Sequence, residues 1–417
     1  MLEYSGAGRG SFILAKHMNP SLPLSGLRVL DLSRVLAGPL AAQVLGDLGA
    51  DVVKVEHPAR GDDTRDWGVR TGVHNSAYFN SMNRNKRSIT LDLQQPEGQR
   101  IARELALQSD VVIQNFKFGG TARMGLDYDT LAAANPGLVY CSITGYDPTG
   151  PEAARPGYDL VVQGETGLMG LNGEEGQAPL KFGVAMVDLF TGMSAGQAIL
   201  AALWARERNG GQGRHVQLCL HDCGIMLSVY YGMEALIQQA DPPKYGNAHP
   251  SIVPYGVFDA ADGPLVVTVG NNAQFQRFCR DVIQRPELAE DERYATNAAR
   301  SIHRHELLPL IKAELARRPR HDLLEALAQA GIPCGEVLGV MEALTSPRTQ
   351  AAGGVLQTQL TDGTPVPVQA PPYRFEGARM PVRLPPPMLG EHTAAVLHER
   401  LGLDAAGVDA LRAAGVV

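Results

Sequence analysis

The chain has 417 residues, of which 44% are hydrophobic and 19% are charged, and its formal net charge is −7. Such a chain is long enough for two or more domains, and an acidic balance without a basic block argues against a nucleic-acid partner. The apolar run at 198–204 is too short to span a bilayer, so we expect no membrane partner. Five scattered cysteines, an odd number, indicate a reducing compartment and hence a cytoplasmic location.

The N-terminal segment, residues 1–23, has no signal-peptide apolar core, and we expect a loose leader there. Regular structure is predicted after it. Residues 27–32 and 51–56 have the apolar pattern of short strands, and helical spacing at 41–48 lies between them. A strand, a helix and a strand in this order predict a parallel βαβ unit with a right-handed crossover.

The same alternation continues to about residue 240. Segments with strand or helix patterns follow at 88–93, 96–108, 110–114, 126–135, 138–143, 159–170, 188–207, 215–220 and 223–239. We therefore predict an α/β fold with a large doubly wound, Rossmann-like domain over residues 24–225.

The pattern changes after Asp241-Pro242-Pro243. Residues 255–258 and 264–269 form a hairpin-like pair of strands. They begin a smaller α+β domain that we place, with its linker, at 226–345. Residues 346–417 read as a returning linker and a C-terminal helical segment that packs on the large domain. Helical stretches of the small domain are predicted at 273–284, 301–317 and 320–330.

Polar loops follow several predicted strands, at the edge where doubly wound sheets bind ligands. The chain has no G-x-G-x-x-G fingerprint and no Walker loop. In their place are cationic, aromatic and glycine-containing loops at 33–39, 83–87, 114–125 and 144–146. Arginine and lysine suit phosphate groups and apolar side chains suit an adenine ring, so this mixture favours a phosphorylated nucleotide. A solvated basic loop is the alternative interpretation of 83–87.

Asp188 lies between Val187 and Leu189, where an apolar run becomes the start of a predicted helix. A charge without a partner is costly to bury at such a position. The carboxylate is therefore interpreted as a helix cap or as a chemical group, and the two roles are compatible.

Five ordered motifs give the chain a family resemblance. They lie at 30–39 (LDLSRVLAGP), 49–56 (GADVVKVE), 83–88 (NRNKRS), 140–146 (YCSITGY) and 183–188 (GVAMVD). The chain resembles the family III CoA-transferases, the CaiB/BaiF or formyl-CoA transferase-like group, from about Leu24 to its C-terminus. Within that group it is most similar to the succinyl-CoA:glutarate (hydroxymethylglutarate) CoA-transferases, through motifs at 61–68, 248–255, 270–275 and 385–390.

The resemblance implies an enzyme that moves CoA from an acyl-CoA, expected to be succinyl-CoA, to a carboxylic acid such as glutarate. Asp188 matches the family's nucleophile. Because a carboxylate is ionised at neutral pH, we expect it to attack the thioester without a partner base. The implied path runs through a mixed anhydride and an enzyme-CoA thioester, from which water must be excluded. No metal and no permanently bound cofactor are implied, since coenzyme A and acyl-CoA are substrates.

The same resemblance assigns two groups of contacts. CoA is expected to contact Val35, Leu36, Leu91, Asn115, Phe116, Arg123, Met124 and Arg155. The acid substrate is expected to contact Tyr158, Asp159, His249, Gly270, Asn271, Asn272 and Gln274. The last four belong to a loop that corresponds to the one with which family members close the site. A strand-to-helix turn capped by asparagine is the structural alternative for this loop.

Two other functions remain open. An α-methylacyl-CoA racemase of this fold places a histidine in a Gly-His-Asp motif, which here reads Gly157-Tyr158-Asp159, and tyrosine is a poor proton shuttle at neutral pH. A non-catalytic acyl-CoA-binding protein would use Asp188 only as a helix cap. Family members are interlocked dimers, so the resemblance also implies a homodimer, with long linkers around Pro242 and at 347–387.

Overall fold

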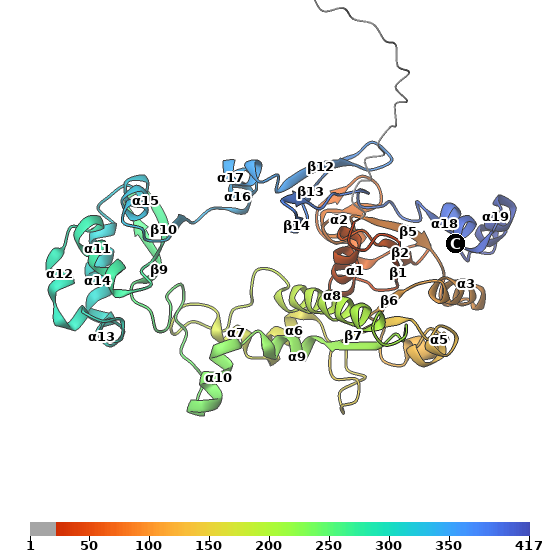
Figure 1. The fold of residues 1–417 in the computed structure, drawn as a ribbon, viewed down its shortest axis with the longest axis horizontal. Coiled ribbons are helices and arrows are strands. Elements are labelled where there is room, and N and C mark those ends of the chain that lie inside the picture. Colours follow the sequence, from red (N-terminus) through yellow and green to blue (C-terminus); the bar gives the residue numbers. More distant parts are fainter. Residues whose placement is uncertain (1–21) are drawn as a thin grey trace, which may run out of the picture.

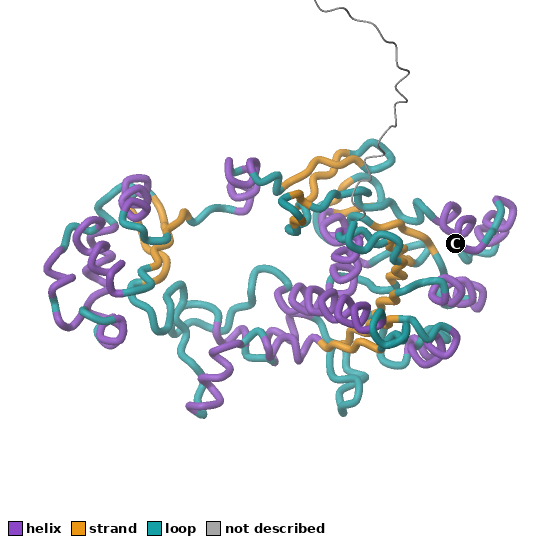
Figure 2. The backbone as a smooth tube through the Cα atoms, viewed as in Figure 1, coloured by secondary structure: helices purple, strands orange, loops and turns teal. Residues whose placement is uncertain are grey.

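The computed structural model describes residues 22–417, which form two lobes (Figure 1). The larger lobe contains a parallel sheet, and the smaller lobe is mostly helical (Figure 2). Two separate segments join them, residues 239–254 and residues 337–354. Most of the predicted leader, residues 1–21, lies outside the described residues.

A six-stranded sheet, parallel throughout, forms the centre of the larger lobe. Its strand order is β5-β2-β1-β6-β7-β8, so the chain winds outward from β1 in one direction and from β6 in the other. The topological switch point therefore lies between β1 and β6. The predicted α/β fold is confirmed. The strands are β1 (Arg28–Asp31), β2 (Asp51–Glu56), β5 (Lys86–Thr90), β6 (Val111–Gln114), β7 (Val139–Thr144) and β8 (His215–Cys219).

Helices cover both faces of this sheet and create two apolar cores. On one face, α1 (Ala37–Asp47) and α8 (Met186–Arg206) pack against the strands. The other face is covered by two helices from the middle of the lobe and two from the C-terminus. These are α3 (Pro96–Leu107), α5 (Tyr128–Ala134), α18 (Thr393–Leu401) and α19 (Ala405–Ala413).

The segment between β2 and β5 contains short elements that its sequence pattern does not predict. Arg65 fastens this segment to the sheet, because its guanidinium pairs with Glu56 at 2.7 Å and lies 3.6 Å from the ring centroid of Phe79. Both ion-pair partners are buried, and so the segment is held at the carboxyl end of β2. Its elements are a 3-10 helix (Asp63–Asp66), β3 (Arg70–Thr71), β4 (Asn75–Ser76) and α2 (Ala77–Met82).

Two helices predicted as continuous are broken. The first is interrupted at Gly167, whose φ of +79° ends one helix and starts the next. The second is interrupted before Val229, whose φ is also positive at +46°. The resulting pairs are α6 (Asp159–Glu165) with α7 (Leu168–Leu171), and α9 (Leu220–Met226) with α10 (Val229–Gln238).

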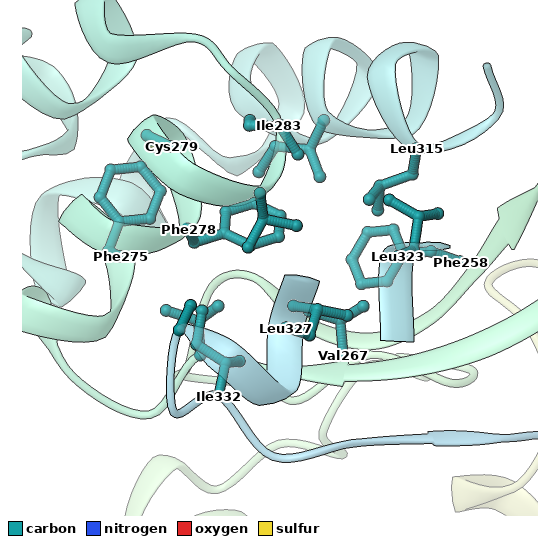
Figure 3. Close-up of a cluster of buried hydrophobic side chains, with 14 of the residues drawn as sticks. Phe258, Val267, Phe275, Phe278, Cys279, Ile283, Leu315, Leu323, Leu327 and Ile332 are labelled. Carbon is teal, nitrogen blue, oxygen red and sulfur yellow. The ribbon is translucent and has the colours of Figure 1, made fainter. Parts of the chain in front are cut away.

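The smaller lobe packs helices on an antiparallel sheet. The predicted hairpin is confirmed as β9 (Tyr255–Ala260) and β10 (Gly263–Thr268), and an unpredicted strand, β11 (Cys334–Glu336), joins β10. Phe258, Phe278 and Leu323 meet in its core (Figure 3). Its helices are α11 (Asn272–Arg277), a π-helical turn (Phe278–Val282), α12 (Pro286–Glu290), a 3-10 helix (Glu292–Tyr294), α13 (Asn297–Ile302), α14 (Arg304–Leu315) and α15 (Arg320–Gln329).

The segment that returns to the larger lobe also contains regular structure. Its hairpin, β12 (Val355–Gln359) and β13 (Pro365–Gln369), has a small core of Leu360, Val366 and Val368. The remaining short elements of the chain are α4 (Gly120–Arg123), α16 (Val340–Thr345), α17 (Pro347–Ala351), β14 (Arg374–Phe375) and β15 (Ala378–Arg379).

Helix α8 is the element that carries Asp188. It is the one helix within residues 22–417 whose length and composition would allow it to cross a membrane, which is weak evidence because 44% of the apolar window is buried in this fold. Gly192 lets it approach α1 closely, since a Cβ atom there would lie 2.6 Å from the carbonyl oxygen of Ala37. This contact sets the first turns of α8 beside the loop between β1 and α1.

We expect Gly192→Ala to destabilise the protein by about 1–3 kcal/mol, because the added methyl group must push two helices apart. Thermal or urea unfolding measures the change. Gly164→Ala is the matched control in α6, where the nearest atoms to a new Cβ are 3.9 Å away. That control should be neutral or stabilising by up to about 1 kcal/mol, and equal losses in both variants would contradict the close-contact argument.

Candidate active site

The loop after β1 lies at the topological switch point and is held there in a strained conformation. Val35 has a φ of +72°, which is unfavourable for a β-branched residue. Its N–H donates to Asp62 Oδ1 at 3.3 Å. The neighbouring Arg34 backbone is bonded in both directions by the Asn115 side chain, at 2.9 and 2.8 Å. Since Asn115 follows β6, these bonds join the two halves of the sheet.

A cavity of about 440 Å³ opens beside this loop. Four predicted CoA contacts, Leu91, Phe116, Arg123 and Met124, line it together. The cavity also has cationic side chains at Arg34, Arg60, Lys117 and Arg123, and His57 lines it as well. Within residues 22–417 the side chains of Arg60, Lys117 and Arg123 make no ion pair. They are therefore available to a phosphorylated ligand. Arg60 was not predicted, although its position just after β2 is a signal that could have identified it.

A second cavity, of about 180 Å³, shares Arg34, Phe116 and Lys117 with the first. Its walls include four further predicted residues, namely Val35, Asn115, Arg155 and Tyr158. The Arg155 guanidinium is already paired with Glu152 and Glu165, so a ligand phosphate would have to compete with two carboxylates. Leu36 is buried at the start of α1 and lines neither cavity.

The predicted cationic loop at 83–87 is wrong as a ligand-binding loop. Strand β5 begins at Lys86, two residues before the predicted start, so this segment lies at the amino end of the strand. Its charges are used internally: Arg84 pairs with Asp47 at 2.5 Å and Lys86 with Asp31 at 2.9 Å. Because these four side chains are buried, the solvated-loop alternative is wrong as well.

Asp188 is not the cap of its helix. Helix α8 begins at Met186, and the N–H groups of Val187 and Asp188 donate to Oδ1 of Asp159, at 2.8 and 3.2 Å. Asp159 is held in turn by the Gln163 amide, which donates to its other oxygen at 2.6 Å. Asp159 therefore occupies the capping role, and the half-buried Asp188 carboxylate has no hydrogen-bond partner within residues 22–417.

The ionisation of Asp188 also differs from the expectation. Burial, and secondly the negative charge of Asp159, raise the pKa of Asp188 to about 7. The helix dipole favours the anion at this position, yet desolvation has the larger effect. The carboxylate is thus partly protonated near neutral pH instead of fully ionised. Such a poised, unpaired group in a partly buried position is typical of reactive residues.

An unpredicted aromatic pair faces the same carboxylates. Burial and the charges of Asp188 and Asp159 raise the pKa of Tyr78 in α2 to about 12, so its hydroxyl is neutral and able to donate. The Trp67 ring packs edge-on against it with 5.7 Å between centroids. Both residues come from the 57–85 segment, whose short elements have no clear periodicity in the sequence.

The other predicted acid-binding residues lie apart from α8 in the single chain, because His249 is in the joining segment 239–254 and residues 270–274 lie between β10 and α11 of the smaller lobe (Figure 1). His249 Nδ1 accepts N–H bonds from Ser251 and Ile252, both at 3.1 Å, so the ring proton is on Nε2. At the other predicted position, Asn271 caps α11 by accepting the N–H of Gln274 at 2.9 Å. The loop is thus a strand-to-helix turn capped by asparagine, which is the structural alternative given above. The exposed Asn272 takes no part in this cap.

Known proteins with similar sequences and structures define the family. Residues 24–393 match CoA-transferase family III. A succinate–glutarate CoA-transferase of Agrobacterium fabrum is 44% identical over 387 residues, which is 91% of this chain and 96% of the relative. A succinyl-CoA:glutarate CoA-transferase of Mus musculus is 40% identical, over 95% of this chain and 90% of the relative. A CaiB/BaiF family protein from Brucella suis has a crystal structure with a TM-score of 0.81 and 43% identity, covering 91% of this chain and 100% of that one.

The chain therefore belongs to CoA-transferase family III. It is an enzyme of the CoA-transferase class, and its substrates include CoA thioesters. This assignment favours CoA transfer over the racemase and over the non-catalytic binding protein.

Removing the charge of Asp159 should lower the pKa of Asp188. In Asp159→Asn the amide oxygen still accepts the helix N–H bonds, whereas the repulsion between two carboxylates is lost. The acidic limb of the pH profile of kcat/KM for an acyl-CoA should move below its wild-type midpoint, without reaching the ordinary aspartate value because burial remains. Asp222→Asn, an exposed first-turn aspartate of α9, is the matched control and should leave the limb in place. An unmoved limb in Asp159→Asn would show that Asp159 does not tune the pKa of Asp188.

Proposed function

We propose that this enzyme transfers CoA from succinyl-CoA to glutarate or a similar dicarboxylate, with Asp188 as the nucleophile. The observation that carries the proposal is the capping of α8 by Asp159, which leaves the Asp188 carboxylate without a competing hydrogen bond from any of residues 22–417. An uncommitted carboxylate is able to attack a thioester carbonyl that is brought within its reach.

The reaction balances without a metal, ATP or a net proton. An Asp188 oxygen attacks the thioester carbonyl carbon, and the C–S bond breaks to give a mixed anhydride and CoA thiolate. The thiolate then attacks Cγ of Asp188, so the donor acid leaves as a carboxylate and an enzyme thioester remains. An acceptor carboxylate attacks that thioester, forming a second anhydride, and the thiolate then attacks the acceptor's acyl carbon. Asp188 is regenerated and the acceptor acid leaves as its CoA thioester.

The two joined cavities support a path for CoA toward Asp188. The larger one offers cations that have no ion-pair partner among residues 22–417 for phosphate groups, and the apolar side chains of Leu91 and Met124 for the base. The smaller one extends from there to Tyr158, whose neighbour Asp159 contacts the first turn of α8. The predicted contacts Val35, Asn115 and Phe116 lie along this path.

The choice of acids rests on similarity. The two relatives described above act, by their names, on succinate or succinyl-CoA and on glutarate. We carry that pair to this chain as a proposal, together with the absence of a permanently bound cofactor and a cytoplasmic location.

Asp188→Asn tests the nucleophile. Mixed with succinyl-CoA and glutarate, the wild type should form glutaryl-CoA, and the variant should be slower by at least about a thousandfold because an amide is a poor nucleophile. Product is followed by mass spectrometry. Because the pKa of Asp188 is raised in the folded state, ionisation of this carboxylate destabilises the fold, and the free energy of unfolding falls as the pH rises toward about 7. Asp188→Asn removes this effect, so at about pH 8 the variant should be at least as stable as wild type. Full exchange activity in a folded variant would end the nucleophile proposal.

We further propose that a second copy of the chain completes the enzyme as a homodimer. Helix α10 has no buried residue, and Met233, Leu236 and Ile237 are 58%, 68% and 77% exposed. A ten-residue helix is marginal in water unless an apolar face is covered. It also borders an apolar groove of about 490 Å³. A second copy would cover this face.

Sedimentation at micromolar concentration tests the dimer. The wild type should sediment with twice the chain mass, and Leu236→Glu combined with Ile237→Glu should weaken the association at least tenfold, because two charges would be buried. Ile302→Glu, on an exposed position of the smaller lobe, serves as the control and should remain associated. A monomeric wild type would contradict the proposal.

A further inference from the structure

Arg300 of α13 is a buried cation without an anion. Its side chain is fully buried, and within residues 22–417 no carboxylate lies within ion-pair distance. It donates instead to three neutral oxygens: the carbonyls of Val253 at 2.7 Å and Tyr294 at 2.9 Å, and Oδ1 of Asn272 at 3.1 Å. The guanidinium carbon also lies 4.3 Å from the centroid of the Phe275 ring.

In the larger lobe, by contrast, three buried cations each have a carboxylate partner. Lys54 pairs with Asp62 at 2.9 Å, Lys86 with Asp31 at 2.9 Å, and Arg65 with Glu56 at 2.7 Å. A buried charge without a partner is much less favourable than a buried pair. Consistent with this, burial lowers the pKa of Arg300 to about 10. The smaller lobe therefore contains a buried positive charge that has no carboxylate partner within residues 22–417 and that contacts Asn272 and Phe275 of α11.

That charge fixes the orientation of the Asn272 amide. A guanidinium only donates hydrogen bonds, so it must face the amide oxygen of Asn272 and not the nitrogen. The NH2 group of this exposed residue then points away from Arg300, and it has no hydrogen-bond acceptor within residues 22–417. Its two N–H donors are polarised by the cation on the other side of the amide.

The surrounding loop is held rigidly. Asn271 uses its oxygen to cap α11, and Gln274 accepts the N–H of Gly270 at 2.8 Å while it donates to the carbonyl of Gly331 at 3.1 Å. Of the polar side chains in 270–274, Asn271 and Asn272 both keep their NH2 groups without an acceptor within residues 22–417, but only the Asn272 oxygen is bonded to a buried cation. Asn272 is therefore the loop amide whose orientation is fixed by Arg300.

We propose that Asn272 binds a carboxylate of the acid substrate through its side-chain NH2 group, and that Arg300 is the positioning residue that orients this amide. The assignment rests on the proposed function, in which a carboxylic acid accepts CoA, and on the expected contact of loop 270–274 with that acid. It adds to the expected contact at Asn272 the group that binds and its supporting cation, Arg300, which the sequence pattern of the loop does not indicate.

Asn272→Asp tests this arrangement, because it gives Arg300 a counter-ion while it removes both donors. The variant should unfold at a higher temperature than wild type, since a buried cation gains a partner. Its kcat/KM for glutarate, with succinyl-CoA as donor, should fall at least tenfold, because the acid meets a like charge where it met donors. Affinity for free CoA, measured by calorimetry, should be unchanged.

Asn271→Asp is the matched control. Aspartate is as good a helix cap as asparagine, and position 271 does not contact Arg300, so this variant should keep the wild-type melting temperature and lose less of the glutarate activity. Arg300→Lys, which keeps the charge but has fewer donors, should raise KM for glutarate more than it lowers kcat.

Wild-type kcat/KM for glutarate in Asn272→Asp would overturn the binding role of Asn272. A lowered melting temperature in that variant would overturn the contact with Arg300. If no carboxylic acid accepts CoA from succinyl-CoA in the presence of the wild-type enzyme, the proposed function is wrong. The melting temperatures of the variants then still decide whether Arg300 contacts position 272.

Discussion

The hydrogen bonds from the first turn of α8 to Asp159 organise the whole catalytic edge. Helix N-termini attract any nearby carboxylate, because several N–H groups there have no partner within the helix. Here the carboxylate of α6 takes that position, and Asp188, although it belongs to α8 itself, is left out. Gln163 extends the arrangement, since it holds Asp159 with its amide nitrogen and the N–H of Phe182 with its oxygen at 2.9 Å. The two helices and the turn between them thus form one unit around Asp188.

Beneath this edge, buried ion pairs hold the backbone where packing alone would not. Lys54 contacts both Asp62 and the carbonyl oxygen of Ser33, and Asp62 in turn accepts the N–H of Val35. This chain of contacts keeps Val35 in its left-handed conformation. Paired charges therefore provide rigidity in the larger lobe. Arg300, which has no ion-pair partner within residues 22–417, instead contacts the amide of Asn272 in the 270–274 loop of the smaller lobe. The same type of buried cation serves two purposes according to whether it has a counter-ion.

Sequence patterns predicted the parallel sheet because its strands are continuous apolar runs separated by helices with clear periodicity. They failed at 83–87, where a run of basic residues looks solvated until its acidic partners Asp31 and Asp47 are known, and these lie about 40 to 55 residues earlier in the chain. They also missed Tyr78 and Arg300. An aromatic residue in a short helix and an arginine on a helical face have many ordinary explanations, and only tertiary contacts distinguish them. Asp188 was identified as important, but its capping competitor and its pKa depend on distances that no spacing rule supplies.

The order of elements along the chain has a consequence for biosynthesis. All six strands of the parallel sheet precede residue 220, yet one of its faces is covered by Val396, Leu397 and Val408 from the last two helices. Between them lies the entire smaller lobe, with a core of its own. A nascent chain therefore presents a complete sheet with one apolar face partly open for the time it takes to synthesise about 175 residues, and chains made from the N-terminus fold domain by domain. Chaperone binding during translation would be concentrated on that face, and release would follow the emergence of the C-terminal helices.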